Sequence, residues 1–134
     1  SDKKTFKKMF FIDNLSPLNT LDQNHLKFLK KNFLFKDKDF KEKKIKTDNL
    51  NNILKKYKFN KVDFLNIDLE GLEYEVIKSL DFKRFKINLI CIEILDHNRI
   101  SKDKSKKIHQ ILKKNNFKYL KKIGVNSIFK NINF

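Results

Sequence analysis

Residues 62–71, VDFLNIDLEG, decide how this chain of 134 residues should fold. The segment 62–67 is dominated by apolar side chains, which predicts a β-strand buried on both faces of a sheet. Asp68 ends that strand, and Glu70 comes near the start of the next helix, where free N–H groups and the helix dipole favour a carboxylate. Gly71 is one of only two glycines, so its presence indicates a turn that other residues would resist.

Predicted strands and helices alternate downstream of this segment. The apolar pattern indicates helices at 73–80 and 101–115, and strands at 87–95, 117–123 and 125–130. This order is typical of parallel βαβ units with helices covering the sheet, and the last two strands are close enough to form an antiparallel hairpin. Ligands bind at the carboxyl ends of strands in such sheets, so we expect Asp68 and Glu70 to share one cleft with the acids of the segment from Glu93 to Asp96.

The first half of the chain shows weaker patterns. A helix is expected at 20–32, with Thr20 or Asp22 as its N-cap. A short strand is expected at 42–47, and Asp48 should then cap a second short helix.

For several single residues the sequence predicts a structural role and no part in a functional site. Cys91 lies in an apolar stretch and should be a buried thiol in a reducing compartment. Ser101 is the expected cap of the helix at 101–115. Glu73 and Glu75 should face solvent on their helix.

The formal net charge of +16 allows two explanations. A polyanion partner would explain it, and a noncatalytic basic module that binds nucleic acid through the helix at 101–115 stays as an alternative. However, only two of the 32 basic residues are Arg, and Ala is absent, which is the composition of a protein from an AT-rich genome. Residues 61–100 carry a net charge of −2, so the lysines have accumulated outside the motif. We therefore expect no specific nucleic-acid partner.

The chain has no apolar run of the roughly 18 residues that a membrane span needs. Its N-terminus lacks the apolar segment of a signal peptide. Together with the single cysteine, these features predict a cytoplasmic protein.

Five segments resemble FkbM-type methyltransferases, which use S-adenosylmethionine (SAM). VDFLNIDLEGLEYEVIKSLDF, from Val62 onward, resembles the family's D-F-L-x-I-D-x-E-G-x-E-x-x-V-L-K segment. The other similar segments, in chain order, are LSPLNTLD at 15–22, KTDNLNNIL at 46–54, INLICIEI at 87–94 and GVNSIFKN at 124–131. An Asp-x-Glu-Gly motif alone would be weak, but matching blocks in order and at similar spacing make a strong case.

The resemblance implies a class I, Rossmann-like methyltransferase sheet, a SAM cofactor and a hydroxyl acceptor on a sugar or another small metabolite. It also implies that Asp68 positions or deprotonates that hydroxyl, and that Glu70 supports Asp68, binds the acceptor or helps to hold a metal. Glu93 and His97 are second candidates, although His97 has the simpler interpretation of an exposed loop histidine. Gly71 shapes the turn.

The chain departs from the family in one respect. The family's SAM cradle is a glycine-rich turn between a strand and a helix, and residues 1–60 contain no glycine. Bare backbone is what lets such a loop approach its ligand. The first residue is Ser rather than Met. We therefore expect residues 1–134 to be a partial domain, the C-terminal half of the sheet, that neither binds SAM tightly nor turns over alone; the DNA upstream would test this.

Two other uses of the acids are open. Asp68 and Glu93 on neighbouring strands of a basic protein also suggest a metal-dependent nuclease, but such cores usually have a lysine two residues after the strand acid, and here Leu95 stands there. Oxygen ligands would suit Mg²⁺, yet the spacing of Asp68, Glu70 and His97 specifies no metal site, and we assign none.

Overall fold

The computed structural model describes residues 5–12, 16, 18–33, 35–96 and 99–134. The chain divides into two compact units. The N-terminal unit consists of Ser1–Asp48 and Leu69–Leu72, and the C-terminal unit of Asn49–Asp68 and Glu73–Phe134.

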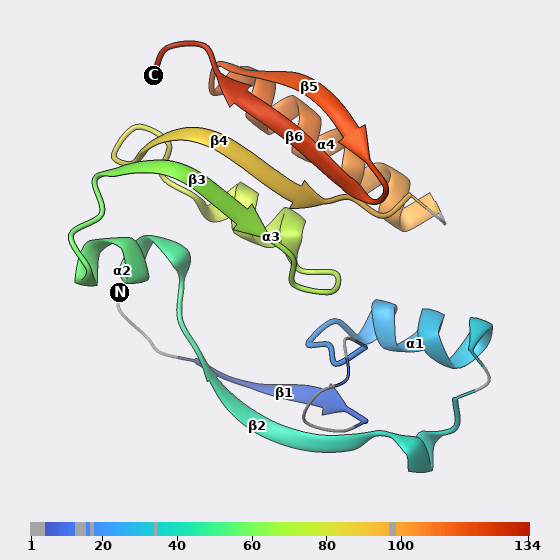
Figure 1. Cartoon of the computed structure of the whole chain (residues 1–134). Helices are drawn as coiled ribbons and strands as arrows, with labels where there is room; N and C mark the ends of the chain where they lie inside the picture. Colours follow the sequence, from blue (N-terminus) through green and yellow to red (C-terminus); the bar gives the residue numbers. More distant parts are fainter. Residues whose placement is uncertain (1–4, 13–15, 17, 34, 97–98) are drawn as a thin grey trace. The chain divides into compact units, whose positions relative to one another are not determined.

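The N-terminal unit contains a two-stranded antiparallel sheet and a helix (Figure 1). Strand β1 (Thr5–Phe11) pairs along its length with β2 (Lys41–Thr47), and a 3₁₀ turn, η1 (Asp37–Asp39), precedes β2. Helix α1 (Gln23–Asn32) begins after Asp22, whose side chain accepts a hydrogen bond from the Asn24 N–H. Of the two expected caps, Asp22 is therefore the one used.

The C-terminal unit contains a four-stranded mixed sheet with the strand order β3-β4-β6-β5. Strand β3 (Lys61–Ile67) is parallel to β4 (Lys86–Glu93), and β6 (Asn126–Asn131) is antiparallel to both β4 and β5 (Phe117–Ile123). The predicted βαβ unit and the closing hairpin are therefore confirmed.

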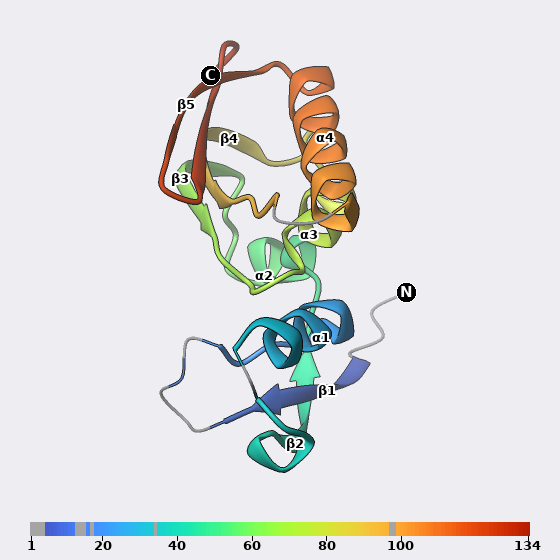
Figure 2. The same ribbon diagram turned by 90° about the vertical axis from the view of Figure 1, so that its right-hand side faces the viewer.

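Helices cover one face of this sheet. Helix α3 (Glu73–Ser79) connects β3 to β4, and α4 (Arg99–Lys114) connects β4 to β5. Figure 2 shows both helices on the same side of the strands. Because β6 is antiparallel to its two neighbours, β5 runs parallel to β4, so both connections are crossovers of the parallel type.

The core lies between the sheet and these helices. It is built from the apolar residues that the sequence pattern marks as inward-facing, including Ile90 and Ile92 of β4 and Ile108 and Leu112 of α4. Leu54 of the short helix α2 (Leu50–Lys56) joins the same cluster. These five side chains are at most 6% exposed. Burial of their apolar surface stabilises the C-terminal unit.

One expectation about the sheet is wrong. Strand β3 is not buried on both faces: among the described strands it pairs with β4 alone, and Phe64 is 57% exposed. Only Ile67, at its carboxyl end, is fully buried. The apolar run is therefore that of an outer strand, whose second face and edge are not covered within the unit.

Several local expectations also need correction. Helix α2 is capped by Asn49 rather than Asp48, and α4 begins at Arg99, so Ser101 lies within the helix instead of capping it. Glu73 is only 7% exposed, whereas it was expected to face solvent. Cys91 is half-buried rather than fully buried.

Candidate active site

Two acids meet at the carboxyl edge of the parallel strands. Ile67 of β3 pairs with Ile92 of β4, and the next residues along the two strands are Asp68 and Glu93. Their carboxylate oxygens lie within 4.8 Å of each other. Parallel register places equivalent positions of neighbouring strands side by side, so two acids that are distant in sequence become neighbours. Of the acids expected to share one cleft, Asp68 and Glu93 of this unit lie close together.

The two acids have different surroundings. Asp68 is exposed, whereas Glu93 is half-buried. In the sheet, Glu93 of β4 is paired with Asn126 of β6. An ionised carboxylate only accepts hydrogen bonds. Two such acceptors close together suit a ligand that carries hydroxyl donors, and the exposed member leaves room for the ligand to approach. The pair can orient a hydroxyl group and accept its proton.

Glu70 belongs to the N-terminal unit, where neighbouring residues hold it. Its backbone carbonyl accepts a hydrogen bond of 2.7 Å from the Thr20 hydroxyl. Its carboxylate Oε2 lies 3.3 Å from Nε2 of the buried His25. Glu70 adopts a left-handed backbone conformation with φ of 52°, which costs an L-residue about 1 kcal/mol. The Thr20 and His25 contacts help to hold this strained turn.

Gly71 has no room for a side chain. Its φ is +110°, and a Cβ atom placed on it would lie 2.9 Å from Oδ2 of Asp22. Asp22 cannot easily move away, because its other oxygen caps α1. A glycine at this point therefore allows both the backbone conformation and the close contact.

The structure also identifies residues that the sequence interpretation missed. His25 is not among the candidates that the sequence suggests, yet it lies against Glu70. Thr20 was considered only as a helix cap, but its hydroxyl bonds to Glu70. No local pattern could indicate these contacts, because Glu70 lies 50 residues beyond Thr20. His97, a second candidate, lies outside the described residues.

No helix in the described part of the chain is both long enough and apolar enough to cross a membrane.

The chain was compared with protein families, curated proteins and solved structures. The family described as "Methyltransferase FkbM domain" matches residues 3–119. No curated protein and no solved structure matches the chain. The matched region contains the strand, the turn and the paired acids described above, and it covers most of the 134 residues. The chain therefore belongs to the FkbM family of methyltransferase domains.

Proposed function

We propose that this chain forms the acceptor-binding wall of a SAM-dependent methyltransferase that acts on a hydroxyl oxygen of a sugar or another small hydroxylated metabolite. The observation that carries the proposal is the pair of carboxylates, Asp68 and Glu93, within 4.8 Å of each other at the ends of β3 and β4. Membership of the methyltransferase family supports the reaction class. The single cysteine, which cannot form a disulfide within the chain, supports a cytoplasmic location.

The proposed role of the acid pair is to orient the acceptor and to take up its proton. Asp68, as the exposed member, accepts the hydrogen bond of the reacting hydroxyl, and Glu93 holds the same group from the neighbouring strand. A base within hydrogen-bond reach of the hydroxyl can receive its proton as the oxygen reacts. Correct orientation of the oxygen is the larger requirement of such a transfer. Glu70 is also proposed as a site residue, and within its own unit its carboxylate lies against His25.

The described residues do not fit the adenosyl cofactor that the family implies. A cradle for SAM needs glycines at which bare backbone contacts the ligand. The chain has two glycines: Gly71 is in contact with Asp22, and Gly124 lies in the turn of the β5–β6 hairpin. We therefore propose that the chain alone does not bind SAM tightly, and we derive no step through the cofactor.

Calorimetry of the purified chain with SAM tests this part of the proposal. We expect no binding tighter than about 100 μM, a weak affinity that corresponds to little more than 5 kcal/mol. Micromolar binding would refute it, because a cradle would then be present in residues that we consider unsuited to one.

Methyl transfer is tested in a fusion protein. A SAM-binding N-terminal half from another FkbM domain is joined to this chain, and transfer of labelled methyl groups to a panel of sugars is measured. We expect Asp68→Asn and Glu93→Gln each to lower the rate by about 10²-fold or more, the usual contribution of a positioned base. Asp63→Asn, on an exposed position of the same strand β3, is the matched control and should leave the rate within about twofold.

One result in the fusion protein would contradict the proposed role of the acid pair. If the fusion protein binds SAM with unchanged affinity and Asp68→Asn transfers methyl groups as fast as the parent, the acid pair has no role. Transfer should also persist in EDTA, because we assign no metal to the pair; complete loss in EDTA that added Mg²⁺ restores would favour a metal site instead.

A further inference from the structure

A basic and aromatic surface lies at the end of the C-terminal unit opposite the acid pair. We define this surface, the amino edge, by three segments: residues 55–61, 81–86 and 131–134. The first two lead into β3 and β4, and the third contains the end of β6 and the C-terminus. Asp68 and Glu93 stand at the other ends of β3 and β4, about 20 Å away for strands of this length. The amino edge is therefore separate from the candidate active site.

Contacts hold the three segments side by side. The Lys86 N–H donates a hydrogen bond of 2.9 Å to the Asn60 carbonyl. The ammonium group of Lys61 lies 4.4 Å from the centre of the Phe134 ring. Figure 1 shows the starts of β3 and β4 on the same side of the unit as the C-terminus. The segments therefore form one continuous surface.

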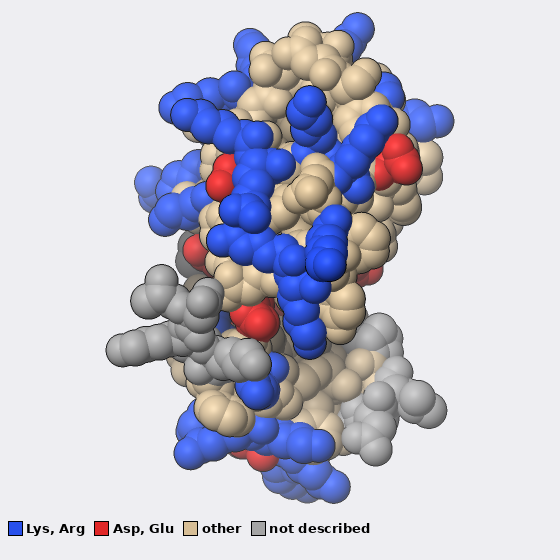
Figure 3. All heavy atoms as spheres, turned by 90° about the vertical axis from the view of Figure 1, so that its left-hand side faces the viewer, with Lys and Arg blue, Asp and Glu red and all other residues tan. Residues whose placement is uncertain are grey.

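The charge of the amino edge is positive. Residues 55–61, KKYKFNK, contain four lysines and no acid, and every one of them is exposed. Residues 81–86 contain three further exposed cations and one acid, Asp81. The Asp81 carboxylate accepts hydrogen bonds from two backbone N–H groups of its own turn. Figure 3 looks onto this side, and in its upper part Lys and Arg side chains surround uncharged surface.

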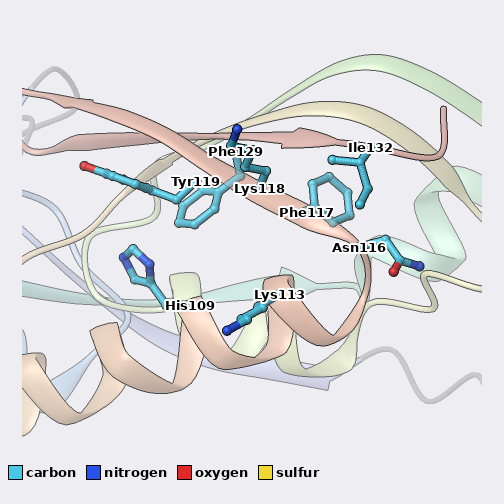
Figure 4. Close-up of a pocket in the computed structure, with 8 residues that line it drawn as sticks. All are labelled: His109, Lys113, Asn116, Phe117, Lys118, Tyr119, Phe129 and Ile132. Atoms are coloured by element: carbon cyan, nitrogen blue, oxygen red, sulfur yellow. The ribbon is translucent and has the colours of Figure 1, made fainter.

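Exposed apolar side chains stand among these cations. Tyr57, Phe59 and Ile132 are each at least 54% exposed, and Phe134 is 40% exposed. Figure 4 shows Ile132 where the chain leaves β6, and its N–H donates a hydrogen bond of 3.0 Å to the Asn116 carbonyl. Exposed apolar groups that are surrounded by polar residues mark surfaces of interaction.

The rings favour a lipid surface over a nucleic acid. A single strand binds aromatic side chains by stacking its bases on their faces. At the amino edge, the ammonium of Lys56 lies 5.1 Å from the centre of the Tyr57 ring, and that of Lys61 lies over Phe134. Bases would have to displace both ammonium groups, and Ile132 offers no ring to stack on. A membrane interface instead accepts aromatic and aliphatic side chains at the level of the headgroups, and anionic headgroups attract the lysines.

We propose that the amino edge binds an anionic lipid surface. Tyr57 and Phe59 enter the headgroup layer, and the surrounding ammonium groups contact the anionic headgroups. Each Lys or Arg that comes near such a surface adds to the attraction. In this orientation the acid pair, at the far ends of the same strands, faces away from the bilayer into water.

The test is co-sedimentation of the full chain with lipid vesicles. Vesicles of phosphatidylcholine with about 30% phosphatidylserine are compared with vesicles of phosphatidylcholine alone. We expect binding to the anionic vesicles to be at least about tenfold tighter. Binding should weaken as the salt concentration rises, because salt screens the attraction between exposed charges.

An introduced tryptophan reports whether the ring at position 59 enters the lipid. The chain contains no Trp, so a single one can be followed by its fluorescence. Phe59→Trp should shift its emission to the blue when anionic vesicles are added, because the ring leaves water. Phe64→Trp is the matched control: Phe64 is 57% exposed but lies within β3, so its emission should not change. Phe59→Ala should weaken vesicle binding about fivefold, and Phe64→Ala less than about twofold.

Matched double variants separate the amino edge from the overall charge of the protein. Lys58→Asn combined with Lys86→Gln should weaken vesicle binding about tenfold. Asn suits position 58, whose φ is 59°, because it tolerates left-handed backbone. Lys102→Gln combined with Lys106→Gln removes the same charge from exposed positions of α4 and should weaken binding less than about threefold.

Three results would overturn the proposal. The first is equal binding to vesicles with and without phosphatidylserine. The second is equal weakening by the two double variants, which would show attraction to the overall charge alone. The third comes from the same variants titrated with a single-stranded oligonucleotide: if Phe59→Ala weakens that binding and leaves vesicle binding unchanged, the amino edge binds nucleic acid instead.

Discussion

At the scale of single residues, the turn after β3 is constrained at two consecutive positions. Glu70 and Gly71 both have positive φ. Thr20 and His25 contact Glu70, and Asp22 leaves no room for a Cβ at Gly71. Strained backbone of this kind persists only where its surroundings require it, and it clusters at functional sites.

Replacement of Gly71 should therefore be costly. We expect Gly71→Ala to destabilise the protein by about 1–3 kcal/mol, because the new Cβ would displace Asp22 from its capping position and occupy an unfavourable φ. Gly124→Ala is the control: its φ is +59° but nothing lies within 4 Å of a new Cβ, so the cost should be about 1 kcal/mol. Urea unfolding followed by circular dichroism measures both. Equal midpoints for the two variants would show that the contact with Asp22 does not matter.

His109 should make stability depend on pH. Its pKa is lowered in the folded chain, first by burial and then by Lys122, so the unfolded chain takes up a proton at a higher pH than the folded one. Stability from this group is complete above about pH 6.5, the ordinary histidine pKa, and is lost as the pH falls toward the lower folded pKa. We expect His109→Gln to lose less stability than the wild type when thermal unfolding is compared at pH 7.5 and 5.5. An identical loss in both proteins would contradict this assignment.

At the scale of elements, strand β3 is the case in which pattern and environment differ. A strand segment in which four of six residues are apolar, as at 62–67, predicts a strand buried on both faces, but β3 is the outer strand of its sheet. Its neighbour β4 has the same apolar character, and it is buried because it pairs with a strand on each side and lies under α3 and α4. Strand composition therefore predicts the presence of a strand better than its place in the sheet.

The position of β3 leads to a stability prediction. Phe64 of β3 is 57% exposed, whereas Phe129 of β6 is 1% exposed. We expect Phe64→Ala to cost about 1 kcal/mol or less, because little apolar area returns to water. Phe129→Ala should cost about 3–5 kcal/mol through lost burial and a cavity. The two variants are compared by urea unfolding; similar costs would mean that Phe64 is covered in solution.

At the scale of the whole molecule, the dominant feature is the net charge of +16. Lysine side chains spread over the visible face in Figure 3, with few acidic side chains among them. Charges that are paired among the described residues include Lys8 with Glu42 and Lys122 with Asp96. Such a surface attracts any polyanion, but a surface with only two Arg provides few of the bidentate contacts that read bases.

We expect this surface to give weak binding to nucleic acid without sequence preference. The Kd for an arbitrary DNA duplex should be in the range of about 10⁻⁴–10⁻⁶ M at physiological salt and should rise steeply between 50 and 200 mM salt. Filter binding at these two concentrations, with a second duplex of unrelated sequence as competitor, measures it. Nanomolar binding that one duplex competes and the other does not would instead favour the binding-module function.

The sequence by itself determined the alternation of strands and helices in the C-terminal unit, because periodic burial of apolar side chains is a local property. It predicted β4, α4 and the closing hairpin, and it placed Asp68 and Glu93 at neighbouring strand ends. It also indicated the family through ordered motifs. It did not indicate β1, whose pairing with β2 is seen only once the chain has folded.

Only the tertiary structure decided which positions are covered and which residues meet. Burial of Glu73 and exposure of Phe64 depend on what packs around them, and no periodic pattern contains that information. The contacts of Thr20 and His25 with Glu70 join segments some 50 residues apart. Contacts of this range arise from the packing of the folded chain, so local preferences cannot reveal them, whereas the acid pair was predictable because parallel register follows from the βαβ order.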